Sequence, residues 1–376
     1  KTWGAGRYCS GTEFADAVDR VRPVAERFRR DAGCPASVHG MASLAASCEV
    51  FRARGLELVV METGMGGRFD LVQGLRKRLT VITDLGLDHT RALGETLEEI
   101  AWHKAGIMEP RVPCVAVQGP GWPVLEKEAR ALGTPLHPVR PEALVRALGP
   151  PERGGRSVTL VLPFLGEVDL VLPGPAAFQV RNAAVAAAAL DRLAAAGLPL
   201  EAGHLAAGFR EARYPGRYEE VQASPRVILD GAHNPQKAAA LLETFRADAG
   251  RGLRVLVAGL SGAREGGPLL AGFRDLADLL VATRVELYGK ATAPAGAVAA
   301  AARAVGLRTL TEPEPERALD RALAAAGPEG TVLVTGSLYL VGRLRDRWYP
   351  WPRVLLEGTS WPSLTPGGGS ATVTPA

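Results

Sequence analysis

The spacing of apolar residues divides the first half of the chain into short helices and strands. Residues 13–33 repeat apolar side chains at helical intervals, and residues 41–54 predict a second helix. Three apolar runs, LELVVMET, TVITDLG and CVAVQG, predict buried strands. A helix is expected at 95–107, because Thr96 followed by Glu99 has the spacing of a capping box. This alternation predicts a mainly parallel sheet with helices on both faces.

The second half shows a change of pattern and then a return to the alternation. Around residues 140–175, the runs SVTLVLPF and VDLVLPG predict antiparallel strands, and an alanine-rich helix is predicted at 180–197. After the segment RYPGRYE, strand-like runs again alternate with helices. We therefore predict an α/β protein with a first domain at 1–213, a hinge at 214–222, a second domain at 223–349 and a disordered tail, rich in Pro, Gly, Ser and Thr, at 350–376.

Composition and charge argue against several classes of protein. Hydrophobic residues make up 47% and charged residues 22%, which is typical of a globular chain. The net charge of +4 is spread over 376 residues, so we expect no nucleic-acid partner. The sequence has no apolar run of about 18 residues and no signal-peptide pattern, so we expect no membrane association. The four cysteines form no CxxC pair and are interpreted as reduced thiols: Cys9, Cys34, Cys48 and Cys114.

Candidate chemistry lies in the loops after the predicted strands, because ligands of parallel sheets bind beyond the carboxyl ends of strands. The glycines of GMGGRFD allow close backbone approach, but their spacing does not match a dinucleotide fingerprint. Asp88 and His89 follow the second run, where the imidazole could bind a metal or simply form a hydrogen bond. Lys104, one of six lysines, lies beside Ala105 and Gly106 in the next helix. It is either a reactive lysine or a surface lysine.

Two further segments carry residues of the kind that bind nucleotides. Asn182, near the start of the alanine-rich helix, could contact a base edge or serve as a capping residue. Arg217 stands in a Pro-Gly turn at the domain boundary, and a guanidinium there suits phosphate. Asp230 and His233 flank a Gly-Ala turn at a strand end, and Pro235 begins the next helix, whose N-terminus favours anions.

These segments occur in one order along the chain: ETGMGGRFD, LDHT with KAGI, FQVRNA, YPGR, DGAHNP and GSLYLVG. The order resembles the folylpolyglutamate synthase/dihydrofolate synthase family of the Mur-ligase superfamily, over about residues 10–345. The resemblance implies an N-terminally incomplete P-loop ATPase domain with a mainly parallel sheet, followed by a Rossmann-like ligase domain. It also implies a ligase that joins L-glutamate to folate or dihydropteroate through an acyl phosphate, with ATP and Mg²⁺ as cofactors. We expect a cytoplasmic monomer whose partners are these small molecules.

The resemblance implies roles for individual residues. His89 matches the family's magnesium-ligand histidine. Lys104 matches a lysine that is carbamylated in the family and positions the metal. Carbamylation turns an ammonium into an anion, which gives a physical reason for a roomy, partly desolvated lysine. Four residues match ATP contacts: Asn182 on the adenine side, Arg217 on the phosphates, and Asp230 and His233 from the second domain.

The chain departs from the family pattern at several positions. The phosphate-binding loop G-T-x-G-K-G-[ST] does not occur in the 376 residues, and the glycines of GAGRYCSGT lack the lysine. Met41 aligns with a magnesium-binding glutamate, Gln73 replaces a small residue or asparagine, and GLSGAREGG stands where Asp-Lys-Asp is usual. The chain is interpreted as a fragment, or one with a misassigned start, that is inactive as it stands. Alternatively, it is a non-catalytic homologue that binds nucleotide or folate, or another Mur-type ligase. We expect little ATP turnover and weak magnesium binding.

Overall fold

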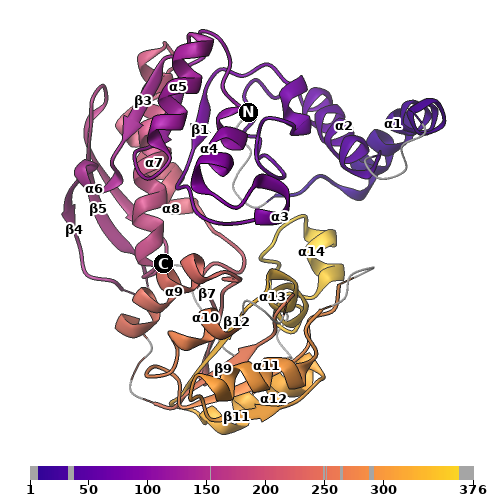
Figure 1. Ribbon diagram of the computed structural model, residues 1–376, viewed down its shortest axis with the longest axis vertical. Coiled ribbons are helices and arrows are strands. Elements are labelled where there is room, and N and C mark those ends of the chain that lie inside the picture. Colours follow the sequence, from indigo (N-terminus) through magenta and orange to yellow (C-terminus); the bar gives the residue numbers. More distant parts are fainter. Residues whose placement is uncertain are drawn as a thin grey trace.

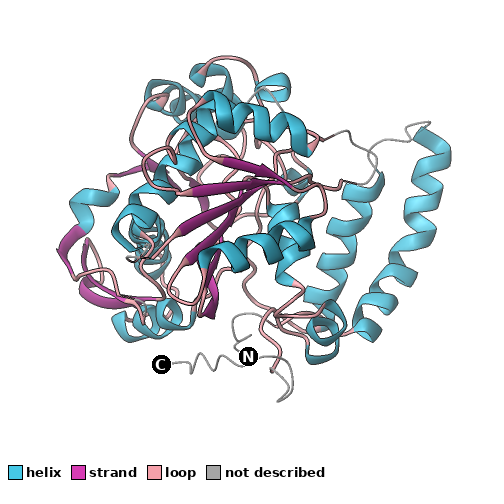
Figure 2. Cartoon of the chain, turned by 90° about the horizontal axis from the view of Figure 1, so that it is seen from below, coloured by secondary structure: helices cyan, strands magenta, loops and turns pink. Residues whose placement is uncertain are grey.

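The computed structural model describes residues 7–32, 38–152, 154–248, 250, 252–262, 266–287 and 292–363, and it confirms an α/β protein. Two lobes follow one another along the chain, the first coloured indigo to magenta and the second orange to yellow (Figure 1). Helices surround the strands in the view from below (Figure 2).

A three-stranded parallel sheet forms the centre of the first domain. Its order is β1-β2-β3, with β1 at Thr80–Ile82, β2 at Cys114–Val117 and β3 at Leu136–Val139. The apolar run CVAV is buried along its whole length as the middle strand. Helices α4 (Leu97–Ala105) and α5 (Trp122–Leu132) cover one face, and α7 (Ala177–Ala195) covers the other. The parallel sheet predicted from the alternation is confirmed.

The start of α4 is the capping box that the sequence predicts. The side chain of Thr96 accepts a hydrogen bond from the backbone N–H of Glu99, and the Glu99 carboxylate accepts one from the N–H of Thr96. The two short helical segments before α4 are η1 (Leu71–Gly74) and α3 (Thr90–Leu93).

A small antiparallel sheet completes the first domain, as SVTLVLPF and VDLVLPG predict. Its order is β4-β5-β6, with β4 at Val145–Leu148, β5 at Arg156–Leu162 and β6 at Gly166–Leu172. Alternate residues of β5 and β6 are buried against α7 and α8 (Ala202–Glu211). The short α6 (Pro141–Leu144) joins β3 to this sheet.

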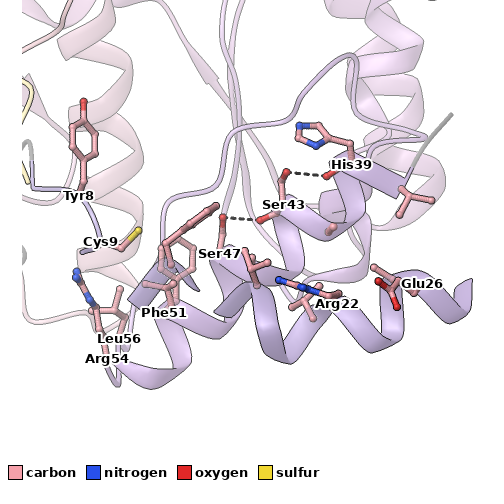
Figure 3. Close-up of a pocket in the computed structure, with 18 of the residues that line it drawn as sticks. Tyr8, Cys9, Arg22, Glu26, His39, Ser43, Ser47, Phe51, Arg54 and Leu56 are labelled. Carbon is pink, nitrogen blue, oxygen red and sulfur yellow. Dashed lines mark hydrogen bonds between the residues drawn. The ribbon is translucent and has the colours of Figure 1, made fainter. Parts of the chain in front are cut away.

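The first two helices form a hairpin at one side of the first domain, α1 at Gly11–Ala32 and α2 at Val38–Ala53 (Figure 1). A cavity of about 760 Å³ lies between them, and Ser43 and Ser47 on its α2 wall donate to backbone carbonyls of the same helix (Figure 3). Phe14 and Phe28 on α1 remain 57% and 44% exposed. The apolar face predicted for α1 is therefore only partly covered.

The strand predicted at LELVVMET is wrong. Residues 57–63 belong to no strand among the described residues, and Val60 is 94% exposed. A strand requires the hydrogen bonds of a neighbouring chain segment, and periodicity alone cannot supply that neighbour. The following glycine loop is nevertheless ordered by Asp70, which accepts hydrogen bonds from the backbone of Gly64, Met65 and Val72.

The second domain is built on a six-stranded sheet in the order β11-β10-β9-β12-β8-β7. Its strands are β7 Glu219–Ala223, β8 Arg226–Leu229, β9 Arg254–Ala258, β10 Leu279–Ala282, β11 Thr309–Thr311 and β12 Thr331–Thr335. All pairs are parallel except β7 with β8. One face is covered by α9 Pro235–Asp248, α10 Gly266–Ala271 and α11 Ala295–Ala304, and the other by α12 Pro315–Ala326 and α13 Leu338–Arg345. Helix α8 ends at Glu211 and β7 begins at Glu219, so the interdomain segment covers residues 212–218, whereas the predicted hinge covered 214–222.

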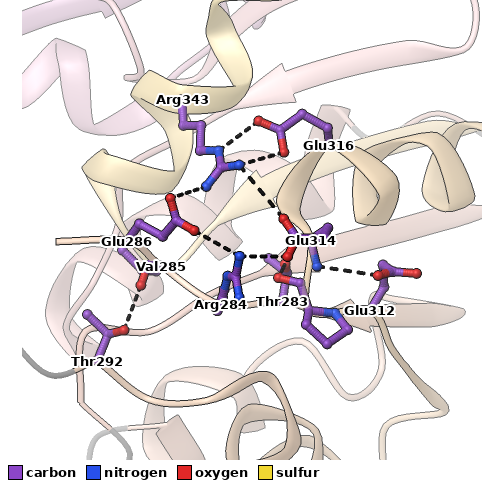
Figure 4. A network of polar contacts seen from close by, with 10 residues as sticks. Thr283, Arg284, Val285, Glu286, Thr292, Glu312, Glu314, Glu316 and Arg343 are labelled. Carbon is purple, nitrogen blue, oxygen red and sulfur yellow. Dashed lines mark hydrogen bonds and ion pairs between the residues drawn. The ribbon is translucent and has the colours of Figure 1, made fainter.

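An ion-pair network lies at the carboxyl ends of β10 and β11 (Figure 4). Arg343 on α13 pairs with Glu286 and Glu316, and Arg284 pairs with Glu286 and Glu314. These side chains are between 31% and 56% exposed, so each pair contributes little to stability. Together they join α12 and α13 at this end of the sheet.

The predicted disordered tail is wrong for residues 350–363, and 364–376 lie outside the described residues. Helix α14 occupies Trp351–Glu357, and the backbone of Gly358 accepts a hydrogen bond from Tyr8. The indole N–H of Trp361 donates to Glu219, which also forms a buried, doubly hydrogen-bonded pair with Arg345. Composition suggested disorder, but aromatic and polar side chains give this segment specific partners.

Two further expectations concern cysteines and membranes. Cys9, Cys48 and Cys114 are free thiols, and Cys34 lies outside the described residues. Within the part of the chain that the structure describes, no helix has the length and apolar character needed to cross a bilayer.

The Glu219–Arg345 pair should be required for stability. Removing one partner of a buried ion pair leaves the other charge without compensation, so we expect Glu219→Gln to lower the free energy of unfolding by about 3 kcal/mol. Urea unfolding measures this. Asp320→Asn breaks the exposed Arg347–Asp320 pair and serves as the control, with an expected loss below about 1 kcal/mol. Equal losses in the two variants would contradict the prediction.

Candidate active site

The two domains meet where the loop after β1 contacts the first turn of α9. Asp88 Oδ2 accepts hydrogen bonds from Asn234 Nδ2 at 3.2 Å and from Lys237 Nζ at 3.1 Å. At Gly86, an added Cβ atom would lie 1.9 Å from Gln236 Oε1, so the loop backbone closely approaches the tip of this side chain. The carboxyl end of β1 in the first domain thus faces the N-terminus of α9 in the second domain.

His89 stands next to this contact in a left-handed conformation, with φ 52° and ψ 36°. Its backbone N–H donates to Asp88 Oδ1 at 2.9 Å, and its Nε2 lies 3.9 Å from the same oxygen. The side chain is 56% exposed. A histidine held in an uncommon conformation beside a carboxylate, with an accessible imidazole, has the character of a binding-site residue.

Lys104 is half-buried on α4 near the same carboxylate. Its ammonium group makes no hydrogen bond or ion pair with any described residue. Burial lowers the pKa of Lys104, the charge of Asp88 opposes this effect, and the charge of Lys237 adds to it. Burial also works against ionisation of Asp88, yet Lys237 and His89 hold the pKa of that carboxyl below its ordinary value. His89 and Lys104 therefore share one electrostatic environment, and their predicted roles remain predictions.

His233 lies on the second-domain side of the contact. Its Nδ1 is 2.9 Å from the carbonyl oxygen of Gly231, and its Nε2 is 3.0 Å from Lys237 Nζ. Burial lowers the pKa of His233, and the positive charges of Lys237 and Arg217 act in the same direction, whereas the Gly231 carbonyl and Asp88 raise it. A neutral imidazole is thus favoured at this position.

Asp230 is buried and has both oxygens engaged by backbone groups. Oδ2 accepts from the N–H of Tyr218 at 2.9 Å, and Oδ1 accepts from the N–H of Ala232 at 2.8 Å. Burial raises the pKa of Asp230 to about 6, although both hydrogen bonds and Arg217 oppose the rise. The sequence indicated a nucleotide contact here, and the structure shows a carboxylate that ties the interdomain segment to the end of β8.

Arg217 and Asn182 are exposed and stand apart from the direct contact. An added Cβ at Gly231 would lie 3.0 Å from Arg217 Nη1, so this guanidinium lies across the DGAH turn. Asn182 Nδ2 donates to Gln179 within α7 at 3.1 Å. Its neighbour Arg181 reaches Asp84 in the loop after β1 through two hydrogen bonds. The start of α7 is thereby joined to the loop that carries Asp88 and His89.

The sequence did not indicate that Asn234, Gln236 and Lys237 make the interdomain contact, although Asn234 belongs to the DGAHNP motif. They follow DGAH directly, and Lys237 appeared only as one of six lysines. The signal available for Lys237 was the rarity of lysine in this chain. A rare residue type directly after a motif, in the first turn of a helix, is a candidate for a specific role.

The side chains that the structure describes do not form a magnesium site by themselves. Among the described residues, no group of three or more His, Cys, Asp or Glu side chains gathers closely enough to hold a metal ion. Mg²⁺ takes an octahedral set of mainly oxygen ligands. Here Asp88 offers one carboxylate, whose Oδ2 already accepts from Asn234 and Lys237.

Comparison with known proteins identifies the class of the second domain first. Residues 216–338 match the family described as Mur ligase, glutamate ligase domain. The matched range begins in the interdomain segment, contains Asp230 and His233, and reaches the first residue of α13.

Relatives extend the match to the first domain. A Haloferax volcanii protein named "Probable bifunctional folylpolyglutamate synthase/dihydropteroate synthase" is 31% identical over 323 residues, which are 79% of this chain and 35% of the relative. A Bacillus subtilis dihydrofolate synthase/folylpolyglutamate synthase is 29% identical over 300 residues, 78% of this chain and 67% of the relative. The crystal structure of Mycobacterium tuberculosis folylpolyglutamate synthase complexed with ADP and AMPPCP has a TM-score of 0.80 at 26% identity, covering 90% of this chain and 79% of that one.

The second domain thus matches the Mur-ligase glutamate ligase domain, and the chain is similar along most of its length to folylpolyglutamate synthases and dihydrofolate synthases, as its motifs predict. It spans between about a third and about two thirds of the length of the two curated relatives.

Asp230 should make stability depend on pH. Its folded pKa of about 6 lies above the ordinary 3.8, so between these values the folded protein binds more protons than the unfolded chain. The free energy of unfolding therefore falls as pH rises through this interval. We expect Asp230→Asn to remove this part of the slope when urea unfolding is compared at about pH 4 and about pH 7. Asn in place of the exposed Asp16 should leave the slope unchanged; an unchanged slope in Asp230→Asn would contradict the assignment.

Proposed function

We propose that the chain is the ATP-dependent ligase portion of a folylpolyglutamate or dihydrofolate synthase. The proposal rests on a cluster of nitrogen-bearing side chains between the domains. Around the single carboxylate of Asp88 lie Lys104, Lys237, His89 and His233. This cluster lies at the carboxyl end of β1 and the N-terminus of α9, a location that favours anions. Both domains contribute nitrogen groups that can donate hydrogen bonds to phosphate oxygens, which suits a polyphosphate.

The comparisons support ATP as the nucleotide, because the related Mycobacterium tuberculosis structure is complexed with ADP and AMPPCP. In this proposal Arg217 contacts the phosphates and Asn182 the adenine side, as the motifs suggest. The acceptor is a folate or dihydropteroate, and the amine is that of L-glutamate. The free thiols are in keeping with a cytoplasmic enzyme, which we propose acts as a monomer.

The proposed reaction proceeds in two steps. A carboxylate oxygen of the acceptor attacks the γ-phosphorus of ATP, the bond to the bridging oxygen breaks, and ADP leaves. The amine of glutamate then attacks the acyl carbon, inorganic phosphate leaves with the electrons of the C–O bond, and the amine loses a proton. Arg217 and Lys237 would stabilise the charge on the transferring group. Mg²⁺ is proposed to enter with the nucleotide, since phosphate oxygens supply the ligands that the side chains lack.

Lys104 is proposed to carry the carbamate that the family resemblance implies. A neutral amine must add to CO₂, forming an N–C bond and releasing a proton. The half-buried position of Lys104, its unpaired ammonium among the described residues and its lowered pKa all favour the neutral amine. The product is an anion within the same environment as His89.

Titration calorimetry with ADP tests the nucleotide site. We expect the chain to bind ADP, and Arg217→Met to weaken binding about tenfold, since a charge-assisted hydrogen bond to phosphate is lost. Arg146→Met removes an exposed arginine of the antiparallel sheet and should change nothing. A folded protein that binds no ADP would contradict the proposal.

Phosphate release that requires both glutamate and dihydropteroate or folate distinguishes a ligase from a nucleotide-binding homologue.

Carbon-13 NMR tests the carbamate. With ¹³C-labelled bicarbonate at mildly alkaline pH, we expect a carbamate resonance from the wild-type chain, because a lysine with a lowered pKa is the most readily carbamylated. Lys104→Arg should abolish the resonance, and Lys127→Arg, at an exposed position of α5, should retain it. A resonance that persists in Lys104→Arg would assign the carbamate to another amine.

A further inference from the structure

One ammonium group joins a carboxylate of the first domain to an imidazole of the second. Lys237 Nζ lies 3.1 Å from Asp88 Oδ2 and 3.0 Å from His233 Nε2. Its side chain is 42% exposed, so the ammonium is at the edge of the contact and remains accessible to a ligand. No role for Lys237 follows from the motifs.

The hydrogen bonds around His233 determine its tautomer. The carbonyl of Gly231 can only accept, so the Nδ1 atom 2.9 Å away must carry the proton. A lysine ammonium can only donate, so Nε2 must present its lone pair to Lys237. The Gly231 carbonyl and Lys237 together favour the neutral imidazole with the proton on Nδ1, and the positive charge of Lys237 disfavours protonation of Nε2.

The same ammonium restrains the loop that carries His89. Asp88 Oδ2 accepts from Lys237 in the first turn of α9 and from Asn234 just before the helix, while Gly86 of the same loop packs against Gln236. An isolated exposed ion pair would contribute little. Here the ion pair shares its acceptor with a second interdomain hydrogen bond, and its donor also engages His233.

We propose that Lys237 is a positioning residue of the interdomain site. It holds the Asp88 loop at the N-terminus of α9, donates to Nε2 of His233 and so reinforces its Nδ1–H tautomer, and contributes a cation from the second domain to the proposed anion site. The last of these roles rests on the proposed function, whereas the first two concern the chain alone.

Nitrogen-15 NMR of histidine-labelled protein tests the tautomer. The chain has six histidines, and the His233 signals are assigned by their loss in His233→Gln. We expect the Nδ1–H tautomer in the wild type, a shift of the Nε2 resonance in Lys237→Met because the donor to its lone pair is lost, and recovery of the wild-type resonance in Lys237→Arg, which keeps a donor. Lys127→Met should leave the His233 signals unchanged. Wild-type His233 signals in Lys237→Met would overturn the proposal, because a merely structural lysine would leave them so.

ADP binding provides a second, independent measurement. Lys237→Met should weaken ADP binding about tenfold and Lys237→Arg should restore most of it, with urea unfolding confirming that both variants fold. Unchanged ADP affinity in a folded Lys237→Met would overturn the cationic role. If the wild type binds no ADP, the proposed function fails, and the histidine spectrum alone decides whether Lys237 positions His233.

Discussion

The attachment of Asp88 to the first turn of α9 is the interaction on which the site depends. One carboxylate receives donors from both domains: the His89 N–H from its own loop, and Asn234 and Lys237 at the N-terminus of α9. None of these bonds is strong alone, because the carboxylate is partly exposed. The loop is also held at its start, where Arg181 binds Asp84. The candidate site residues of the first domain therefore neighbour those of the second only while the two domains remain in contact.

Local chemistry made much of the fold predictable. The capping box at Thr96 and Glu99, the buried run CVAV and the alternation of the second domain each depend on residues close in sequence. The failures at residues 57–63 and 350–363 have the opposite cause. In the first, a strand-like run has no pairing partner among the described residues. In the second, a polar, proline-rich segment is held by Glu219 and Tyr8, which are far away in sequence.

The membership of the candidate site was predictable in part, and its hydrogen bonds were less so. The order of motifs indicated His89, Lys104 and His233, and the structure brings these side chains within electrostatic reach of Asp88. The motifs could not indicate that both carboxylate oxygens of Asp230 accept hydrogen bonds from backbone N–H groups. That arrangement depends on how the interdomain segment folds over the end of β8. Nor could the motifs indicate the bonds of Lys237, whose partner Asp88 is 149 residues away.

The return of the C-terminal segment to Tyr8 has a mechanical consequence. The second domain is joined to the first through the peptide segment at 212–218, and it is joined again where residues 358–360 meet Tyr8. Two attachments keep the domains closer together than one does, so each domain meets the other at a raised effective concentration. We therefore expect the first turn of α9 to return to Asp88 more readily while the contact at residues 358–360 is formed.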